Sequence, residues 1–563
     1  MKLDRRSLLG LLGASAGGAC ATTPTQAADA TVAFSHGVAS GDPDQTSAVF
    51  WTRVTPSAPD AGDIVVGLEV ARDPGFADIV VRRDDLIASA ERDFTVKTDL
   101  DGRGLQPGLT YHYRFTAAGV TSPVGQVRTL PEGATADVVL AVASCQLYPG
   151  GLFNAYEAMA GLERLDAVVH LGDYIYEYGA EADDYGMTTG AALGRIPQPP
   201  HEIVTLADYR TRHALYKSDP DLQAAHARAA FICVWDDHEV ANDTWMGGAQ
   251  NHQPETEGDF AQRKAAALRA YYEWMPIREA APGRLKEAIN RSFHFGDLVS
   301  LIMVETRLLG RTEALSYGQL TLQPDGAPDV AAFLARRAEP SRDLLGEDQR
   351  RWLGAELAAS RQAGRPWQVL GNQVVTARVR GPDVTKMLPA EQISALLTTL
   401  PDDVRGQVEA AIGLFRLGLP FNLDSWDGYP AGRERLYQTF QEAGVEPIML
   451  AGDSHAFWVN ELHDDSGRRA AVEFGTSAIS SPSPGDQVGG LPLGPALMMA
   501  NPEEVRFCDQ ASKGFILLTL TPDHATAELR AVSTIRAKPF EVSTVARYTV
   551  PRTDTGLGPL QPG

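Results

Sequence analysis

The stretch that decides the fold is Val234–Thr244, which reads Val-Trp-Asp-Asp-His-Glu-Val-Ala-Asn-Asp-Thr. It follows the apolar run Ala229–Cys233, which predicts a short buried strand, so the polar side chains emerge where that strand ends. Taken alone, the cluster is equally well explained as an ordinary polar loop. The same arrangement recurs after other apolar runs, and this recurrence favours a functional interpretation.

Five further apolar runs are also followed by polar residues with metal-binding or hydrogen-bonding side chains. These polar groups are Ser144–Gln146, Gly172–Glu177, Glu305–Arg307, Gly371–Gln373 and Gly452–His455. Strands that alternate with helices predict an α/β core. Since ligands of an open α/β sheet bind outside the carboxyl ends of its strands, we expect the six groups to converge on one site.

The strands expected in this core, besides the one before Val234, are Asp137–Ala143, Asp166–Leu171, Asp297–Val304, Trp367–Leu370, Pro447–Leu450 and a hairpin of Gly514–Thr521 with Ala525–Ser533. The expected helices are Leu152–Leu162, Leu206–Leu215, Asp259–Glu273 and Gly346–Ser360. Two irregular segments, Gly179–His201 and Arg380–Pro430, are long enough to be insertions that frame a pocket.

Residues 31–130 have the pattern of a β-sandwich domain, with short alternating strands between Pro- and Gly-containing turns. Leu105–Phe115 resembles the corner of a fibronectin- or immunoglobulin-like sandwich, with Tyr111 at the corner. Leu130–Ala134 is the expected linker. We therefore expect a catalytic domain over residues 136–535 and a C-terminal tail over residues 536–563.

The composition is that of a folded globular protein with an excess of acidic residues. The chain has 563 residues, 44% of them hydrophobic and 22% charged, and a net charge of −22. This charge disfavours general binding to nucleic acids or anionic membranes and favours divalent cations. Beyond the N-terminus, no run approaches the roughly 20 apolar residues of a membrane span, so no transmembrane anchor is expected.

Residues 1–30 are expected to be an export signal. Arg5 and Arg6 precede a weakly apolar, Gly- and Ala-rich run, and Ala28–Ala30 offers a small-residue cleavage site. The paired arginines resemble a twin-arginine signal, which implies the twin-arginine translocase as a partner and a periplasmic or secreted protein; a general secretory signal is the alternative. Without Cys20, three cysteines remain, an odd number that leaves at least one thiol unpaired.

Four of the polar residues suit a centre with two metal ions. Asp173 and Asp237 supply anionic oxygens, Asn242 a neutral oxygen and His455 an imidazole. Structural explanations remain open for each type: a Gly-Asp pair such as that at Asp173 or Asp453 also forms turns and helix caps, and a single histidine often serves only the protein core.

Cys145 and Tyr176 are less common ligands. Their ordinary pKa values, near about 8.5 and 10, mean that only a strongly Lewis-acidic ion would hold both deprotonated at neutral pH. A trivalent iron ion satisfies this requirement. The alternatives are an inert buried thiol for Cys145 and an aromatic pocket wall for Tyr176.

Two further residues are expected to stabilise the charge of a transferred phosphoryl group, His238 and Arg307. Arg307 has the alternative of pairing with Glu305. The residues expected to orient the ligands rather than bind metal are Asp236, Glu239 and Asn372.

The motifs also resemble a known family. Gly172–Tyr176, Asp236–Glu239 and Gly452–His455 occur in the order found in calcineurin-like metallophosphoesterases, and Gly-Asp-x-x-Tyr is similar to the motif of purple acid phosphatases. With Ser-Cys after the first strand, a preceding sandwich and a twin-arginine signal, nearly the whole mature chain resembles the PhoD-type alkaline phosphatases. One position departs from that pattern, since Glu305 is one methylene longer than the expected aspartate.

This resemblance implies a four-layer αββα core, hydrolysis of phosphomonoesters and phosphodiesters, and a centre of Fe³⁺ and Ca²⁺. It implies iron ligands at Cys145, Asp173, Tyr176 and His455, with Asp173 bridging the two metals. The implied calcium ligands are Asp237, Asn242 and Asp453. No serine nucleophile in an Asp-Ser-Ala motif is evident, which argues against the serine-type phosphatase mechanism.

The leading hypothesis is an exported phosphoesterase in which metal-bound hydroxide attacks phosphorus in line and releases phosphate. A phosphodiesterase of phospholipase D type on the same scaffold is the alternative, because substrate preference depends on the irregular insertions rather than on the metal motifs. A different class, a non-catalytic extracellular binding protein with structural metals, is disfavoured because six convergent polar groups exceed what a structural site needs.

Overall fold

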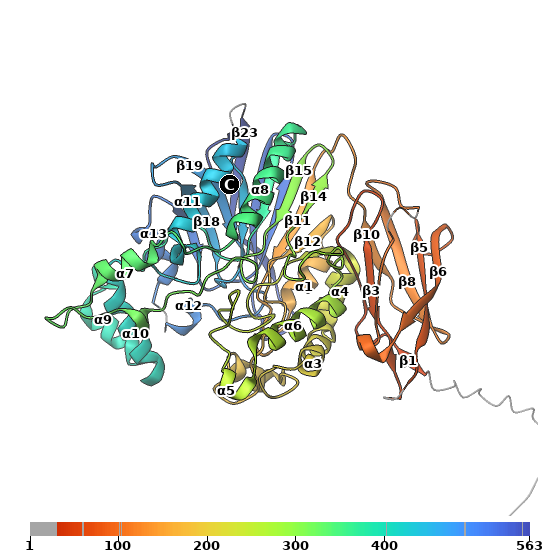
Figure 1. The fold of residues 1–563 in the computed structure, drawn as a ribbon, viewed down its shortest axis with the longest axis horizontal. Coiled ribbons are helices and arrows are strands. Elements are labelled where there is room, and N and C mark those ends of the chain that lie inside the picture. The colour runs from red at the N-terminus through yellow and green to blue at the C-terminus, as the bar shows by residue number, and fades with distance from the viewer. Residues whose placement is uncertain are drawn as a thin grey trace, which may run out of the picture.

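The computed structural model describes residues 31–563 except 59, 60, 101, 103, 401, 489, 490, 554 and 555. The expected export signal lies outside the described residues. Within them the chain forms two large sheets, of eleven and seven strands, with helices on both sides (Figure 1). The expected mixed α/β class is therefore confirmed.

Three parallel strands form the centre of the eleven-stranded sheet. They are β11 (Val138–Ala143), β12 (Ala167–His170) and β13 (Ala230–Cys233). On one side the sheet continues with antiparallel neighbours, which are β21 (Lys513–Leu520), β22 (His524–Val532) and β23 (Val542–Thr553). The expected C-terminal tail thus contributes a long strand, because the backbone of residues 542–553 pairs antiparallel with β22 and extends the sheet.

The seven-stranded sheet has a second parallel set, formed by β15 (Val299–Met303), β16 (Trp367–Gly371), β17 (Ile448–Ala451) and β19 (Arg469–Gly475). Antiparallel strands complete it, namely β14 (Arg291–Phe295), β18 (Phe457–His463) and β20 (Val505–Asp509).

The two sheets share one hydrophobic core. Leu301 and Met303 of β15 belong to the same buried cluster as Leu140 of β11, while Ile302, between them, belongs to a second cluster. That second cluster includes residues of α8 (Gly346–Gln362) and α11 (Pro430–Ala443). Alternate residues of β15 therefore face the other sheet and a helical layer, as expected for a strand buried on both faces.

The other helices of the core contribute to the shared cluster with the eleven-stranded sheet. They are α1 (Asn154–Ala160), α3 (Leu206–Lys217), α4 (Pro220–Arg228) and α6 (Phe260–Trp274). The sequence predicted α1, α3, α6 and α8 but not α4, which begins where the Asp219 carboxylate accepts hydrogen bonds from the backbone N–H groups of Asp221 and Leu222.

The N-terminal region is not separated from the core as cleanly as expected. One of its sheets contains β5 (Ile64–Ala71), β6 (Ile79–Ala88), β8 (Thr110–Ala117) and β10 (Gly125–Arg128). Three other strands of this region, β2 (Val38–Gly41), β3 (Val49–Arg53) and β7 (Thr95–Asp99), extend the eleven-stranded sheet, because β2 pairs with β13. The expected corner is present: the Gln106 backbone N–H donates to the Tyr111 hydroxyl over 2.8 Å.

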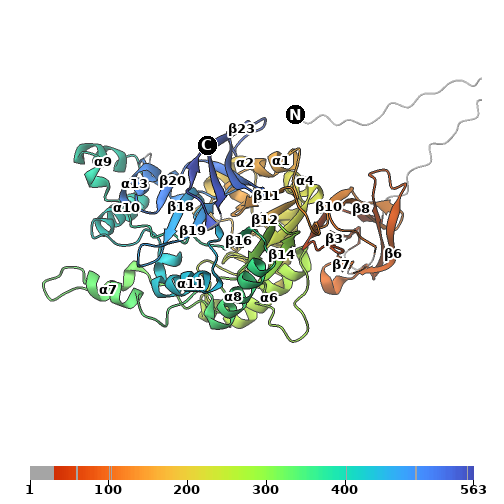
Figure 2. The ribbon, with the colours of Figure 1, turned by 90° about the horizontal axis from the view of Figure 1, so that it is seen from above.

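Both segments expected to be irregular contain helices. The first contains α2 (Met187–Leu193), and the second contains α9 (Ala390–Leu397) and α10 (Asp402–Phe415). Together with α7 (Val330–Arg337), the last two project from the side of the core opposite the N-terminal sheets (Figures 1 and 2). Sequence inspection missed α2 and α9 because they are short and flanked by glycine or proline, and α10 because glycines interrupt its pattern.

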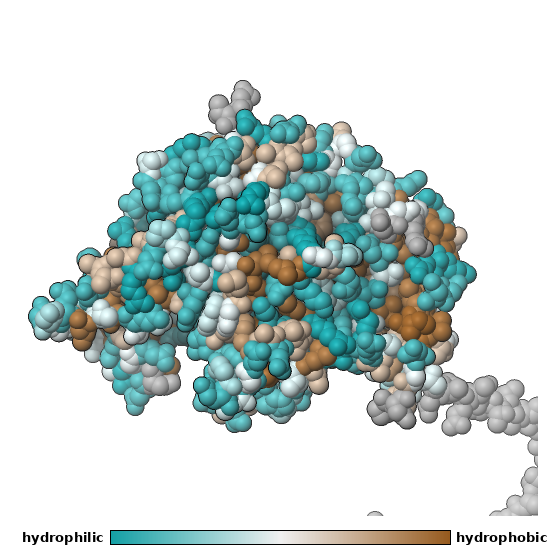
Figure 3. All heavy atoms as spheres, viewed as in Figure 1, coloured by the Kyte–Doolittle hydropathy of each residue, from teal (hydrophilic) through white to brown (hydrophobic). Residues whose placement is uncertain are grey.

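Hydrophilic residues predominate on the face drawn in Figure 3, where apolar residues form separate patches. Among the described residues, no helix combines the length and hydrophobicity that crossing a bilayer requires. Cys145, Cys233 and Cys508 are all buried and unpaired.

A buried lysine lies where the N-terminal strands meet the core. The Lys217 ammonium group at the end of α3 lies 4.4 Å from the centre of the Trp51 ring of β3. It forms a hydrogen bond with Nε2 of His226, 3.3 Å away, and no ion pair joins it to a carboxylate of the described residues. Burial lowers the pKa of Lys217 from 10.5 to about 7.

Because the pKa of Lys217 is lowered in the folded protein, we expect the free energy of unfolding to rise with pH. Between pH 7 and about 10 the unfolded chain binds the Lys217 proton more strongly than the folded protein, so the free energy of unfolding should increase by up to roughly 1.4 kcal/mol per pH unit. Urea unfolding at pH 7 and 9.5 should show a smaller increase for Lys217→Met than for the unmodified protein. Lys286→Met, at an exposed position, is the control; equal increases in all three proteins would contradict the prediction.

Candidate metal centre

The site lies where the parallel strands of both sheets end. The loops after β11, β12 and β13 meet the loops after β15 and β17, as the sequence predicted. The Cys145 backbone N–H donates to the carbonyl of Gly172 over 3.1 Å, and the Gly452 N–H donates to that of Gln373 over 2.7 Å. Neighbouring loops are therefore held together by hydrogen bonds that continue beyond the strands.

The proposed ligands lie on sharply turned backbone. Cys145, Asp173, Asp453 and His455 all have positive φ angles, between 55° and 61°. Such left-handed conformations are uncommon for residues with side chains and are typical of functional sites. At Gly172 a β-carbon would lie 2.3 Å from the Asp236 backbone nitrogen, so only glycine permits these two loops to approach so closely.

One group of candidate ligand atoms comes from the loops that follow β11, β12 and β17. The ligand atoms of Cys145, Asp173 and His455 all lie within 4.8 Å of one another. The Tyr176 hydroxyl is 3.0 Å from Asp173 Oδ2 and 3.3 Å from His455 Nε2. All four residues predicted as iron ligands are therefore neighbours.

The orientation of His455 is fixed by its other ring nitrogen. Nδ1 lies 2.6 Å from the carbonyl oxygen of Pro482, so it carries the proton and donates, which leaves the lone pair of Nε2 facing Asp173 and Tyr176. The Tyr185 hydroxyl lies 3.2 Å from the same Nδ1 and donates to Pro482 as well. Sequence inspection missed Tyr185 because no strand precedes it.

Two further groups share Asp237. In the first group, the Asp237 carboxylate lies within 4.8 Å of the ligand atoms of Asp173 and His238. In the second group, it lies within 4.8 Å of the carboxylates of Asp236 and Asp453. The sequence predicted a ligand role for Asp237 and an orienting role for Asp236, but both contribute to the same acidic group. His238, expected only to face the phosphoryl group, is also close enough to be a ligand.

The electrostatics of these groups fit bound cations. Oδ1 of Asp173, Oδ2 of Asp236 and Oδ1 of Asp237 are buried without a hydrogen-bond partner. Burial, reinforced by neighbouring carboxylates, raises the pKa values of Asp236 and Asp453 well above their ordinary range. Burial and the charge of Asp173 likewise raise the pKa values of Cys145 and Tyr176. These groups need additional positive charge to be stable as anions, and a multivalent metal ion supplies it.

The position of Arg307 corrects the expected role of this residue. Its side chain is fully buried, does not pair with Glu305 and does not line the cleft. Instead it lies beneath the carboxylates, with ion pairs to Asp236, Asp237 at 3.4 Å, Asp424 at 2.7 Å and Asp453 at 3.3 Å. The sequence could not indicate this because Asp424 lies in an insertion and the direction of the side chain depends on tertiary packing.

Glu305 holds the loop that carries Arg307. Its carboxylate accepts hydrogen bonds from the indole N–H of Trp235 and from the backbone N–H groups of Arg307, Leu308 and Leu309. The longer side chain at this position therefore has a structural role in this chain.

Two buried glutamates connect the loops of the site. Glu239, predicted to orient ligands, accepts hydrogen bonds from the backbone N–H groups of Asp173, Tyr174 and Asp236. Glu177, to which the sequence assigned no role, lies 2.7 Å from Nδ1 of His238. Although burial lowers the pKa of His238, the charges of Glu177 and the nearby aspartates raise it well above its ordinary value.

The two asparagines differ in position. Asn242 lines the cleft, where its amide N–H donates to Gln250 over 2.9 Å. Asn372, expected to orient a ligand, is buried, and its amide contacts Trp426 and the following backbone instead. A polar residue after a strand can equally well stabilise the turn itself, which explains this difference.

The ligand groups open into a cleft of about 810 Å³. Both insertions frame it, as predicted, through Tyr185 on one side and residues 421–424 on the other. None of the described residues that line the cleft is a lysine or an arginine. Its outer walls combine acidic side chains, among them Asp183 and Asp184, with the aromatic rings of Tyr178 and Tyr317.

Comparisons with known proteins identify the family. A family model described as "PhoD-like phosphatase" matches residues 140–529, and another described as "PhoD-like phosphatase, N-terminal domain" matches residues 19–131. The chain is 33% identical over 535 residues to "Alkaline phosphatase D" of Bacillus subtilis (strain 168), covering 93% of this chain and 82% of that protein. A solved structure described as "Structure of PhoD" superposes with a TM-score of 0.75 at 31% identity, covering 95% of this chain and 93% of the other. The chain therefore belongs to the PhoD-like phosphatase family and is a phosphoric-ester hydrolase.

Proposed function

We propose that the protein is an exported, metal-dependent phosphatase that hydrolyses phosphomonoesters and phosphodiesters. The observation that carries this proposal is the convergence of Cys145, Tyr176 and His455 around Asp173, next to a second group of buried carboxylates. One set combines thiolate, phenolate and imidazole donors, and the other consists of hard carboxylate oxygens. Two different metals suit these two donor sets.

Fe³⁺ suits the first set and Ca²⁺ the second. Cys145, Asp173, Tyr176 and His455 would hold the iron ion, while Asp237, Asn242 and Asp453 would hold calcium, with Asp173 between the two. When bound, such metals lower the pKa of water to supply a nucleophile and neutralise the charge of the phosphate. Asp236, which shares a group with Asp237 and Asp453, is a further oxygen donor for calcium.

Within this site His238 would stabilise the phosphoryl group. Glu177 holds Nδ1, so Nε2 is the ring nitrogen available to donate to a phosphate oxygen in the cleft. The ring also lies against Tyr176, with centroids 4.2 Å apart, which restricts its rotation. Arg307 would act indirectly, by balancing the charge of four aspartates beneath the metals.

The finer architecture and the location of the protein follow from the same proposal. The two facing sheets with outer helices would form the four-layer αββα core of metallophosphoesterases. The strands of residues 31–130 would form a β-sandwich that is attached to this core. Arg5 and Arg6 would direct the protein through the twin-arginine translocase to the periplasm or the outside of the cell.

A second candidate activity is phosphodiester hydrolysis of phospholipase D type, on substrates that carry a cationic group. The observation that favours it is the lining of the cleft, which includes both carboxylates, such as Asp183, and aromatic rings, such as Tyr178 and Tyr317. Aromatic faces and carboxylates together attract quaternary ammonium groups.

Metal removal and the replacement of Cys145 test the first proposal. The native protein should contain iron and show a visible charge-transfer band from tyrosinate or thiolate bound to Fe³⁺. Cys145→Ala should lower the iron content and weaken the band, whereas Cys508→Ala, at another buried thiol, should change neither. Metal analysis and absorption spectroscopy measure both effects. A colourless, iron-free preparation with full activity towards p-nitrophenyl phosphate would refute the iron assignment, and full activity after chelation would refute metal dependence.

Replacement of His238 tests its proposed role. His238→Gln should lower kcat by about 10² to 10³, the usual effect of removing one donor to the transition state. The metal content should stay unchanged, which separates this role from that of a ligand. His201→Gln, at an exposed position, is the control. If His238→Gln loses metal together with activity, the residue is a ligand rather than a phosphate-binding group.

Matched substrates test the second candidate. The enzyme should hydrolyse p-nitrophenyl phosphocholine with a higher kcat/KM than the ester in which 3,3-dimethylbutanol, a neutral isostere, replaces choline. Asp183→Asn should reduce this preference about fivefold, the effect of roughly 1 kcal/mol from one exposed charge. Glu181→Gln, on the same loop but outside the cleft lining, should leave it unchanged. Equal rates for the two esters would exclude a preference for cationic substrates.

A further inference from the structure

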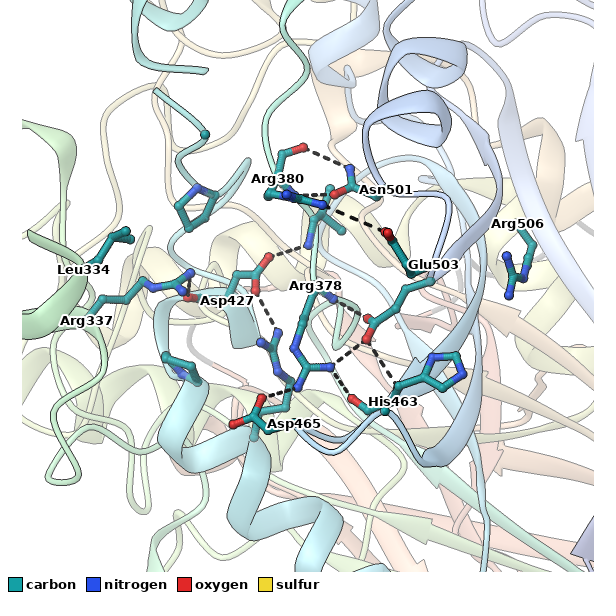
Figure 4. A pocket seen from close by; sticks show the side chains of 17 residues that line it. Leu334, Arg337, Arg378, Arg380, Asp427, His463, Asp465, Asn501, Glu503 and Arg506 are labelled. Carbon is teal, nitrogen blue, oxygen red and sulfur yellow. Dashed lines mark hydrogen bonds and ion pairs between the residues drawn. The ribbon is translucent and has the colours of Figure 1, made fainter. Parts of the chain in front are cut away.

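A second cavity, of about 720 Å³, lies apart from the metal centre (Figure 4). It shares none of its described lining residues with the catalytic cleft, although residues 418–430 contribute to both. Its size is within the range of pockets that bind small molecules. Neither the metal motifs nor the proposed function involves it.

The charged lining of this cavity combines four carboxylates with five arginines. The arginines are Arg337, Arg378, Arg380, Arg433 and Arg506. Most have a carboxylate partner: Arg378 forms ion pairs with Glu434, Asp465 and Glu504, and Arg506 with Glu461. Arg380 forms a longer ion pair with Glu503, at 3.9 Å. The charge of these groups is therefore largely balanced by the protein itself.

Arg337 is the exception. Its guanidinium group donates to the backbone carbonyl of Asp427 over 3.0 Å, and its Nε is buried without a hydrogen-bond partner. No ion pair joins it to any carboxylate in the described part of the chain. In Figure 4 Arg337 extends from one wall, at the end of α7, towards Asp427 and the interior of the cavity.

The nearest candidate partner, Asp427, is already used. One of its oxygens pairs with Arg433 at 2.7 Å, and the other accepts a hydrogen bond from the Val379 backbone N–H over 2.6 Å. Arg433 itself is buried, 3% exposed, and its Nε also has no hydrogen-bond partner. The half-buried Arg337 and the buried Arg433 thus each keep one Nε donor without a hydrogen-bond partner at this end of the cavity, and leaving such donors unsatisfied is costly.

We propose that this cavity binds a phosphate oxyanion, held by Arg337 with help from Arg433. A guanidinium group matches the geometry of phosphate oxygens and gives paired hydrogen bonds. Leu334, Val379 and Pro420 supply apolar walls beside these donors, so the cavity has room for an organic phosphate as well as for inorganic phosphate. The proposal goes beyond the proposed activity and does not depend on it.

Counting bound phosphate tests the proposal. In equilibrium dialysis of the full metal-loaded enzyme against radiolabelled inorganic phosphate, the unmodified protein should bind one phosphate in the cavity in addition to any at the metal centre. Arg337→Gln should lose that phosphate or bind it about tenfold more weakly or worse. Arg337→Lys should bind with intermediate affinity, because it keeps the charge but loses the paired hydrogen bonds.

The neighbouring Arg336 provides a matched control. It lies on the same helix but is exposed, with hydrogen bonds to Gln319, so Arg336→Gln should leave the phosphate count unchanged. Equal counts for Arg337→Gln and the unmodified protein would overturn the proposal, as long as circular dichroism and melting show that both are folded. Such a result would mean that water alone satisfies Arg337.

Competition identifies the source of the phosphate group. Phenylphosphonate, which is not hydrolysed, should displace the cavity phosphate if an organic phosphate is the ligand, whereas displacement by inorganic phosphate alone indicates the free ion. Benzoate, which carries a carboxylate instead of a phosphonate, should not displace the phosphate from the cavity. If benzoate competes as well as phenylphosphonate, and does so only when Arg337 is present, the site selects carboxylates and the assignment to phosphate is wrong.

Discussion

The structure of the catalytic site depends on the ion pairs between one buried arginine and four aspartates. Arg307 has no exposure to solvent, and its partners come from the loops after β13 and β17 and from an insertion. Burying so many carboxylates is costly unless positive charge accompanies them. Arg307, with Arg311 beside Asp424, supplies part of the balancing charge, and the oxygens of Asp173, Asp236 and Asp237 that lack a hydrogen-bond partner suit bound cations.

The loops that carry these acids are held by hydrogen bonds to other buried acids. Glu239 joins the loop after β12 to the loop after β13, and Glu177 joins His238 to the backbone of Asn242. The contact of Glu239 with Asp173, and the bond from the Cys145 backbone N–H to Gly172, make the left-handed backbone at Asp173 and Cys145 tolerable. The positions of these side chains are therefore largely set by hydrogen bonds within the protein itself.

The segment from residue 418 to 430 connects the catalytic cleft to the arginine-lined cavity. Asp424 pairs with Arg307 and Arg311 beside the cleft, and Asp427, three residues later, pairs with Arg433 in the cavity. Each aspartate holds the segment against a buried guanidinium group on its own side. An anion in the cavity would thus contact the same short segment that completes the charge balance of the active site.

The sequence by itself determined the α/β class, most core strands and long helices, and the convergence of Cys145, Asp173, Tyr176 and His455. It did so because parallel strands place their carboxyl ends on one edge, so residues that follow the strands must lie close together. Only the tertiary structure decided the direction of Arg307, the partnerships of Asp424 and Tyr185, the position of Asn372 and the pairing of residues 542–553 with the sheet. These features depend on contacts between segments far apart in the chain, and no local pattern of residue types encodes which side of a loop a side chain will face.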